Sequence, residues 1–280
     1  MIMKTTAAAA VAVIFDLDDT LIDSKALAMD ATAETLEQSG FSDIVVDESS
    51  YAFGSRYVTP KRLAWHATGD TEDPCGPVLA IAFEKYVADL VTIENTPIYD
   101  GVIALLQHLH AKENLLLGVL SNASSSFVYN VINIHELTNT FQLTCGADDV
   151  PEPKPQPGGL NAMLLELRVP APNSIYVGDS PTDGMAASGA HMHSIGVTWG
   201  HNCRSDLEGH FDTVVDTASQ LQAAIEAFLC QREKPAAAVE QASGTEMLEE
   251  RPRRVSWQND VIDNEHMNKM KTDDEYWDGR

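Results

Sequence analysis

Short hydrophobic runs alternate along the chain with longer stretches in which apolar residues recur every three or four positions. The runs have the length of buried strands, whereas the longer stretches have the period of amphipathic helices. Alternation of this kind predicts a parallel sheet with helices on both faces. The predicted strands are residues 11–15, 115–120, 174–177, 194–197 and 213–215, with a weaker candidate at 142–145. The predicted helices between them are residues 101–112, 159–168, 181–188 and 217–229.

The segment of residues 22–96 interrupts this alternation. It holds at least two helical patterns, at residues 25–39 and 78–92, and no run that is typical of a strand. An insertion of this kind after the first strand predicts a helical cap over the carboxyl edge of the sheet. The expected fold is therefore a Rossmann-like, doubly wound α/β core formed by residues 1–21 and 97–230, with an α-helical cap formed by residues 22–96.

The composition of the chain changes near residue 231. From there to residue 280 the sequence has 12 acidic and 8 basic residues, and its apolar residues follow neither the helix period nor the strand period. A segment this polar cannot bury a core of its own. We therefore expect residues 231–280 to form a disordered acidic tail.

The charge and hydropathy of the whole chain exclude two classes of function. With 18 basic and 42 acidic residues the formal net charge is −24, so nucleic acids and anionic lipid surfaces would be repelled. The longest apolar run, residues 7–15, has nine residues, far fewer than the roughly 20 that a membrane span needs. We expect neither a nucleic-acid partner nor a membrane.

The same apolar run has the composition of a signal-peptide core. Aspartates follow it at once, where a cleavage site would have small residues, so a buried strand is the better interpretation. The four cysteines are far apart and form neither a disulfide framework nor a metal motif. Reduced thiols in a cytoplasmic protein fit them best.

Polar groups stand where several of the predicted strands end. Taken singly, each has an ordinary explanation as a helix cap, a turn or a solvated loop. The carboxyl ends of parallel strands meet at one edge of a sheet, so the groups converge there, and converging carboxylates repel one another unless a cation neutralises them. Carboxylate oxygens suit Mg²⁺, which also binds substrate phosphate, and a lysine adds a second positive charge. The groups are Asp16-Leu17-Asp18-Asp19-Thr20, Ser121-Asn122, Pro151-Glu152-Pro153-Lys154-Pro155 and Gly178-Asp179-Ser180-Pro181-Thr182-Asp183.

These four groups, in this order and on these elements, resemble the motifs of the haloacid dehalogenase superfamily of phosphatases. The matching motifs read DLDDT, LSN, PKP and GDSPTD, and the resemblance covers about residues 11–229. A helical cap between the first and second motifs is similar to that of subfamily I. Residues 99–102, 178–190 and 196–200 also resemble the phosphoglycolate phosphatase group.

The resemblance implies a role for each matching residue. Asp16 would be the nucleophile that attacks phosphorus and forms an aspartyl-phosphate. Asp18 would protonate the leaving alkoxide and then deprotonate the hydrolytic water, and an aspartate there places the chain on the phosphotransfer side of the superfamily, apart from the dehalogenases. Lys154 would balance charge on the phosphoryl group and on Asp16. Ser121 and the amides near Asn122 would hold phosphoryl oxygens.

The resemblance also implies a cofactor. Mg²⁺ would be bound by Asp16, the carbonyl of Asp18 and Asp179, while Asp183 would lie behind these ligands or reach the metal through water. Such a site supplies the positioning and charge neutralisation that phosphoryl transfer needs. The expected activity is Mg²⁺-dependent hydrolysis of a small phosphomonoester.

The cap should determine which substrate is used, because the core motifs contact only the phosphoryl group and the metal. The resemblance to the phosphoglycolate phosphatase group implies 2-phosphoglycolate as the favoured substrate. Arg56 stands where the phosphoglycolate phosphatase group usually has a glycine, and this departure leaves nucleotides, pyrophosphate and sugar phosphates open as alternatives. Arg56, Lys61 and Arg62 are among the few basic residues of the cap, and one of them could contact a substrate carboxylate or second phosphate. Arg56 is the preferred candidate; the alternative is that all three form surface ion pairs.

The tail contains Arg253-Arg254-Val255-Ser256-Trp257, which resembles a docking peptide of the RVxF type. Many proteins bind the catalytic subunit of type 1 serine/threonine phosphatase through such a peptide, here through Arg254-Val255-Ser256-Trp257. The stretch also resembles a basophilic kinase site, and phosphorylation of Ser256 would weaken the docking. A second hypothesis is therefore a regulatory or scaffold protein that keeps the fold and uses the tail. The intact catalytic aspartates and lysine favour the enzyme.

Overall fold

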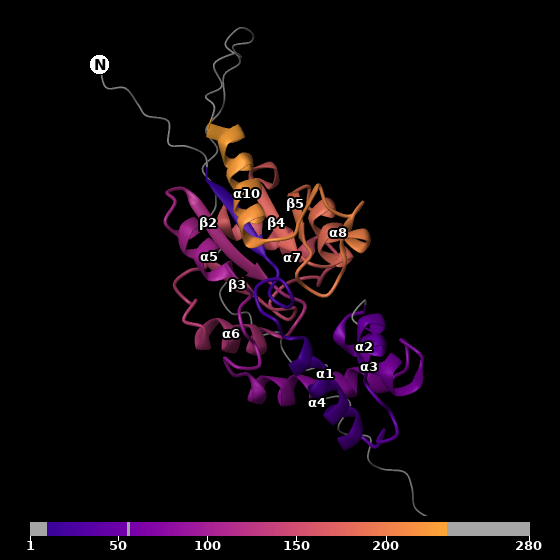
Figure 1. Ribbon diagram of the computed structural model, residues 1–280. Helices are drawn as coiled ribbons and strands as arrows, with labels where there is room; N and C mark the ends of the chain where they lie inside the picture. The colour runs from indigo at the N-terminus through magenta and orange to yellow at the C-terminus, as the bar shows by residue number, and fades with distance from the viewer. Residues whose placement is uncertain (1–9, 55–56, 234–280) are drawn as a thin grey trace, which may run out of the picture. The chain divides into compact units, whose positions relative to one another are not determined.

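A single parallel sheet organises the part of the chain that the computed structural model describes, residues 10–54 and 57–233 (Figure 1). The strand order is β3-β2-β1-β4-β5-β6, and every neighbouring pair is parallel. The strands are β1 (Val11–Phe15), β2 (Leu115–Leu120), β3 (Leu143–Cys145), β4 (Ser174–Gly178), β5 (His193–Val197) and β6 (Thr213–Val215). The predicted doubly wound α/β fold is thereby confirmed, and each predicted strand agrees with the observed one to within one residue.

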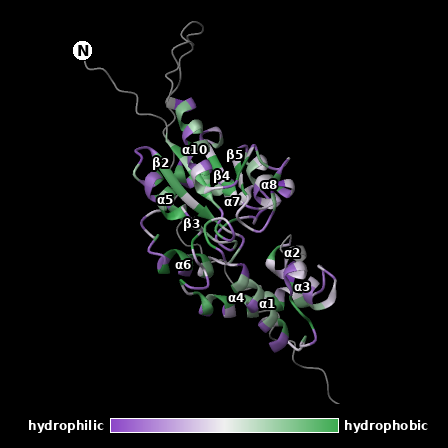
Figure 2. Cartoon of the chain, in the orientation of Figure 1, coloured by the Kyte–Doolittle hydropathy of each residue, from purple (hydrophilic) through white to green (hydrophobic). Residues whose placement is uncertain are grey.

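The strands are hydrophobic at consecutive positions because helices cover both faces of the sheet. In β1, residues Val11, Val13 and Phe15 pack into the hydrophobic cluster on one face, whereas Ala12 and Ile14 pack into the cluster on the other. Strands buried on both faces lose the polar alternation of a half-exposed strand. In Figure 2 the strands accordingly carry the green of hydrophobic residues.

Helices from two groups cover the two faces. The first face packs against α5 (Val102–His110), α6 (Ser125–Ile134) and α10 (Ala218–Glu233). The second face packs against α7 (Gly158–Leu167) and α8 (Pro181–Gly189). Helix α6 was not predicted, and neither were the short α9 (Arg204–Leu207) and the 3₁₀-helix η1 (Ala171–Asn173). Helix α10 continues to Glu233, so residues 231–233, expected as tail, are helical; the rest of that segment lies outside the described residues.

In the described part of the segment expected to be a cap, residues 22–96, the chain forms four helices. They are α1 (Lys25–Gln38), α2 (Glu48–Gly54), α3 (Thr59–Thr68) and α4 (Cys75–Leu90). The sequence predicted α1 and α4 but neither α2 nor α3. Helix α4 packs against α1 and α3, and it also contacts α6 of the core.

The packing of α3 on α4 depends on a glycine. An added Cβ at Gly76 would overlap the carbonyl oxygen of Pro60 and touch the Ala64 side chain. The absence of a side chain at this position therefore lets the backbones of the two helices approach closely. This contact fixes the orientation of α3, which carries two of the basic residues considered above, Lys61 and Arg62.

The strand order reverses at the centre of the sheet. The chain starts at β1, moves outward through β2 and β3, and returns to the other side of β1 as β4. In open α/β sheets, ligands bind outside the carboxyl ends of the strands at such a reversal. Asp16 follows β1 and Asp179 follows β4, so both lie at this point. Within the described residues, no helix is long and apolar enough to cross a bilayer.

Candidate active site

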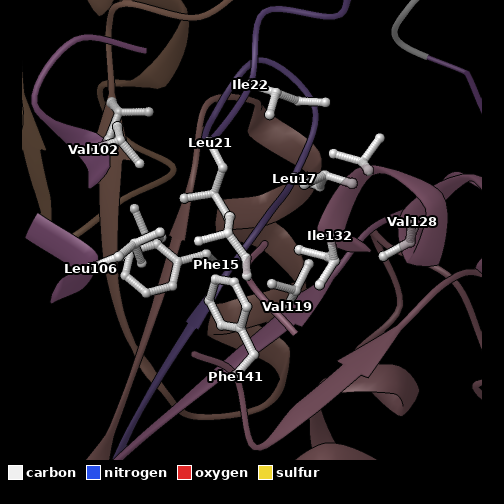
Figure 3. Close-up of a cluster of buried hydrophobic side chains, with 14 of the residues drawn as sticks. Phe15, Leu17, Leu21, Ile22, Val102, Leu106, Val119, Val128, Ile132 and Phe141 are labelled. Carbon is white, nitrogen blue, oxygen red and sulfur yellow. The ribbon is translucent and has the colours of Figure 1, made fainter. Parts of the chain in front are cut away.

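The loop after β1 turns back on itself directly after Asp16. The carbonyl oxygen of Leu17 accepts hydrogen bonds from the amides of Leu21 (2.9 Å) and Ile22 (3.2 Å). The side chains of these three residues are buried, and Figure 3 shows them in the hydrophobic cluster beneath the loop. Because the apolar residues anchor the loop in the core, the carboxylates of Asp16 and Asp18 stay at the edge of the sheet.

A buried lysine joins two of the aspartates. Lys154 Nζ donates to Asp16 Oδ1 at 2.6 Å and to Asp183 Oδ1 at 2.7 Å. Burial alone lowers the pKa of Lys154, but the charges of Asp16 and Asp183 outweigh burial and hold the pKa well above its usual value. Lys154 is therefore a permanent positive charge in this site at neutral pH.

Asn122 positions the backbone of Lys154. The Asn122 Nδ2 group donates to the Lys154 carbonyl at 2.8 Å, and the Lys154 amide donates to Asn122 Oδ1 at 2.9 Å. This reciprocal pair ties the loop after β2 to the loop that carries the lysine. Sequence reasoning placed Asn122 among the phosphoryl-binding residues; its side chain positions the lysine, while the residue itself also lines the cavity.

Asp183 is fully buried, and both of its carboxylate oxygens have donors. Oδ1 accepts from Lys154 and from the Tyr176 hydroxyl at 3.3 Å, and Oδ2 accepts from the amide (3.0 Å) and hydroxyl (2.7 Å) of Ser180. The Ser180–Asp183 pair forms the capping box that begins α8. With its oxygens occupied in this way, Asp183 is suited to a place behind the direct ligands of a cation, as the family resemblance implies.

Two hydroxyl groups orient Asp18. The Ser24 hydroxyl donates to Asp18 Oδ1 at 2.6 Å, and the Ser121 hydroxyl donates to Asp18 Oδ2 at 2.9 Å. The oxygen of Ser121 in turn accepts from the amide of Ala123 at 2.9 Å. Ser24 directly precedes α1, so this hydrogen bond links the loop after β1 to the start of the inserted helices.

Asp179, which follows β4, lies close to the loop after β1. Its Oδ2 accepts a hydrogen bond from the His201 amide at 2.8 Å. A Cβ at Gly200 would overlap the carbonyl oxygen of Asp19 and lie 2.6 Å from the Asp179 carboxylate, so only glycine allows this approach. Burial raises the pKa of Asp179 well above its usual value, and the charges of Asp19 and Asp183 raise it further.

The cluster of carboxylates fits a divalent cation. Asp16, Asp179 and Asp183 place carboxylate oxygens within 4.8 Å of one another. Burial raises the pKa of Asp16, neighbouring aspartates raise it further, and Lys154 opposes them only in part. Burial and neighbouring aspartates also raise the pKa of Asp19 to about 7, and its Oδ1 has no hydrogen-bond donor among the described residues. A cation with hard oxygen ligands, such as Mg²⁺, would offset this excess of negative charge.

Asp16, Asp19 and Asp179 line a cavity of about 180 Å³, and the inserted helices form its other wall; the fully buried Asp183 lies behind the lining. Asp16, Asp18, Ser121 and Lys154 stand on the core side, and the cap side is formed chiefly by residues of α1, α3 and α4. The structure thus brings together all the site residues expected from the core motifs.

The three basic residues considered for the cap have different positions. Arg56 lies outside the described residues. Lys61 is exposed and paired with Glu72, as expected of a surface ion pair. For Arg62 that alternative is wrong, because its side chain is buried and lines the cavity. Sequence reasoning considered Arg62 but could not select it, since α3 was not predicted and the buried face of this helix was unknown.

Comparisons with known proteins give one family for most of the chain. A model described as haloacid dehalogenase-like hydrolase matches residues 13–197. A phosphoglycolate phosphatase from Rhodobacter capsulatus is 32% identical over 195 residues, which cover 68% of this chain and 85% of that protein. One from Colwellia psychrerythraea is 28% identical over 210 residues, covering 71% and 92%. The fold is also that of a haloacid dehalogenase-like hydrolase from Streptococcus pneumoniae, with a TM-score of 0.66 at 19% identity, covering 77% of this chain and 98% of that one.

A second family model matches a separate part of the chain. It is described as protein phosphatase inhibitor and covers residues 234–273, which lie outside the described residues. The match includes the tail residues that resemble a docking peptide.

Proposed function

The chain belongs to the haloacid dehalogenase-like hydrolase family and is a phosphoric monoester hydrolase, and we propose that it hydrolyses 2-phosphoglycolate through an aspartyl-phosphate with Mg²⁺ as cofactor. The observation that carries this proposal is the buried Lys154 between Asp16 and Asp183, with Asp18 held by two hydroxyls in the same cavity. Relatives named phosphoglycolate phosphatases support the choice of substrate.

Charge neutralisation is the first task of the site. The transferred phosphoryl group carries negative charge on its peripheral oxygens, and it must approach a carboxylate that is also negative. Lys154 offsets charge on both, because its ammonium group is held 2.6 Å from Asp16 Oδ1. Mg²⁺ bound by Asp16, the Asp18 carbonyl and Asp179, with Asp183 behind them, would supply the remaining positive charge that phosphoryl oxygens need.

In the first half-reaction, a carboxylate oxygen of Asp16 attacks phosphorus, and the bond between phosphorus and the ester oxygen breaks. Protonated Asp18 gives its proton to the leaving oxygen, so the product leaves as an alcohol rather than as an alkoxide. The hydroxyls of Ser24 and Ser121 keep the Asp18 carboxyl group in place for this transfer.

In the second half-reaction, Asp18 acts as a base. It takes a proton from a water molecule, whose oxygen attacks the phosphorus of the aspartyl-phosphate. The bond between phosphorus and Asp16 breaks, inorganic phosphate leaves, and Asp16 regains its carboxylate. Asp18 ends the cycle protonated, ready for the next substrate.

Phosphate release from a substrate panel tests the proposal. The panel contains 2-phosphoglycolate, pyrophosphate, nucleoside monophosphates, sugar phosphates and an aryl phosphate, each with Mg²⁺ or with EDTA, and the Asp16→Asn variant is the control. We expect the highest kcat/KM for 2-phosphoglycolate, and loss of release with EDTA or in the variant. A preference for another substrate would discard 2-phosphoglycolate and keep the mechanism. Unchanged release in Asp16→Asn would refute the assigned nucleophile.

We propose a second activity for the tail, supported by the protein phosphatase inhibitor match at residues 234–273. Arg254-Val255-Ser256-Trp257 would bind the catalytic subunit of type 1 serine/threonine phosphatase by adding a strand to a sheet edge. Val255 and Trp257 would fill two apolar pockets of the partner. The two activities are compatible, because they use separate parts of the chain.

Calorimetric binding of the full chain to the purified catalytic subunit tests this second activity. We expect the double variant Val255→Ala/Trp257→Ala to lose binding, whereas Val261→Ala, which removes the same kind of side chain outside the motif, retains it. The Asp16→Asn variant should bind as the wild-type chain does. Equal binding by the double variant and the wild-type chain would reject the motif.

A further inference from the structure

Arg62 is a buried cation in the wall of the active-site cavity. The residue is 6% exposed, and it lines the cavity from α3. The guanidinium carbon lies 4.8 Å from the centre of the Phe83 ring and 5.5 Å from that of the Tyr51 ring. Nη1 donates to Thr32 Oγ1 at 3.2 Å, and the Thr32 hydroxyl uses its own proton on the Ala28 carbonyl. These contacts fix the position of the guanidinium group without neutralising its charge.

The charge of Arg62 has no ionic partner among the residues that the structure describes. No carboxylate oxygen of these residues lies within 4.0 Å of its guanidinium nitrogens; Glu84 of α4, which lines the same cavity, is farther away. Arg62 acts on Glu84 only from this longer distance, where its charge partly opposes the rise that burial causes in the pKa of the Glu84 carboxyl. A guanidinium group has five N–H donors, and the bond to Thr32 uses one of them. A buried charge without a carboxylate at ion-pair distance is unfavourable, so an arriving anion would find its site already prepared.

The other basic residues of α3 do not share this position. Lys61 precedes Arg62 directly, but it points to solvent and pairs with Glu72. His66 lies one turn later, where burial, together with the charge of Arg62, lowers its pKa to about 4. His66 is therefore neutral at neutral pH, and Arg62 is the positive charge that α3 brings to the cavity.

We propose that Arg62 is the specificity-determining residue of this site and binds a carboxylate on the leaving group of the substrate. The inference rests on the proposed phosphatase function. The cavity then has two anion sites: the edge of the sheet around Lys154 for the phosphoryl group, and Arg62 for the carboxylate. A guanidinium group matches the planar carboxylate with two parallel hydrogen bonds, whereas a lysine offers only a point charge. The substrate class is a small phosphorylated hydroxy acid, which includes 2-phosphoglycolate.

Steady-state kinetics on two matched substrates tests this inference. 2-Phosphoglycolate and ethyl phosphate have leaving groups of similar size, and only the first carries a carboxylate. Arg62→Met keeps an apolar stem between Phe83 and Tyr51, Arg62→Lys keeps the charge without the fork, and Lys61→Met is the matched control. We expect Arg62→Met to lower kcat/KM for 2-phosphoglycolate about 10- to 100-fold, chiefly through KM, with ethyl phosphate changed by less than about twofold.

The remaining variants should have smaller effects on the kinetics than Arg62→Met. Arg62→Lys should recover part of the loss on 2-phosphoglycolate, and Lys61→Met should behave as the wild-type chain does on both substrates. Thr32→Val removes the hydrogen bond to Nη1 at nearly constant size, so it should raise KM for 2-phosphoglycolate about threefold and leave ethyl phosphate unchanged. This milder variant also serves if Arg62→Met is poorly folded.

Failure of the inference and failure of the proposed function give different results. Equal losses of kcat/KM on both substrates in Arg62→Met, or no loss on either, would overturn the role of Arg62. Phosphate release by the wild-type chain would still support the proposed phosphatase function. No phosphate release by the wild-type chain from either substrate would overturn the proposed function, and this inference with it.

Discussion

The two walls of the active-site cavity are held in contrasting ways. On the core side, charged groups hold one another: Lys154 bridges two aspartates, and Asp183 has donors on both carboxylate oxygens. On the cap side, Arg62 has, among the described residues, one hydrogen bond to a neutral hydroxyl and two aromatic neighbours. The groups proposed to act on the phosphoryl group, which all substrates share, are thus fixed by contacts within the chain. Arg62, proposed to face the variable part of the substrate, has a printed bond on one of its five donors among the described residues.

The largest expected effect comes from changing the core wall at its proposed nucleophile, Asp16. Asp16→Asn should lower kcat by at least about a thousandfold on every substrate, because an amide oxygen does not form the acyl-phosphate. The fold should be retained, since the amide has the size of the carboxylate and removes a charge that its neighbours repel. Phosphate release and circular dichroism measure the two expectations.

The control for this variant is Asp30→Asn, which makes the same chemical change at an exposed position of α1. It should leave kcat unchanged. A loss in Asp16→Asn on 2-phosphoglycolate alone, with other substrates unaffected, would contradict the view that the core wall serves all substrates.

The next effect depends on the leaving group and sharpens the boundary between the walls. Asp18→Asn should lower kcat about 10²- to 10⁴-fold on alkyl phosphates, whose leaving oxygens need a proton, and clearly less on an aryl phosphate. Arg62 variants should instead follow the carboxylate, whatever the basicity of the leaving oxygen. Rates on both kinds of phosphate measure this, and equal losses in Asp18→Asn would argue against its role as an acid.

Metal binding should affect the stability of the core wall in a pH-dependent way. Burial and mutual repulsion raise the pKa of Asp16 and of Asp179, and that of Asp19 to about 7, above their unfolded values near 4. The stability that goes with a raised carboxyl pKa is present below the unfolded pKa and is lost as pH rises through the folded pKa. The metal-free protein should therefore lose stability as the pH rises from about 4 to above 7. A bound cation has most repulsion to offset at the upper end of this range.

Thermal unfolding with Mg²⁺ or EDTA measures this expectation at pH 5 and at pH 8. At a free Mg²⁺ concentration about 100 times its Kd, Mg²⁺ should raise Tm by roughly 5–10 °C at pH 8, and by less at pH 5. Asp179→Asn should reduce the rise. An equal rise at both pH values would show that these carboxyl groups are not the ones that the cation neutralises.

The core wall was more predictable from the sequence than the cap wall, for a physical reason. Strands buried on both faces leave continuous hydrophobic runs, and the carboxyl end of each run marks the shared edge, so the sequence pattern alone places Asp16 and Asp179 together. The long helices α1 and α4 of the cap were also predicted from the sequence. The hydrogen bonds between Asn122 and the Lys154 backbone were not, because they join loops 32 positions apart, and no local pattern encodes that contact.

The short helices of the cap were the main omission. Helix α3 has ten residues, and its burial depends on how it packs against α4 through Gly76. The sequence alone could therefore not separate Arg62, which is buried, from Lys61, which is exposed. Arg56 was preferred because it departs from a family pattern, and that preference stays a prediction, since Arg56 lies outside the described residues.

The smallest expected effect on activity comes from deleting the tail, because this deletion should leave both walls of the cavity unchanged. Helix α10 ends at Glu233, the last described residue. It packs against α5 and β6, and neither of these elements contributes a residue to the cavity. Deletion of residues 234–280 should therefore keep kcat/KM on 2-phosphoglycolate within about twofold of wild type. A collapse of activity would show that the tail supports one of the walls.

A deletion that starts three residues earlier separates stability from activity. The Arg232 guanidinium lies 3.3 Å from the centre of the Phe228 ring and donates to the carbonyls of Phe228 and Pro172. Deletion of residues 231–280 removes these contacts at the end of α10, so Tm should fall by roughly 1–4 °C relative to the shorter deletion. Because the lost contacts lie on helix α10, away from both walls, kcat/KM should be the same in the two deletions. Calorimetric unfolding and phosphate release on the pair measure this, and a difference in kcat/KM would mean that the end of α10 influences the cavity.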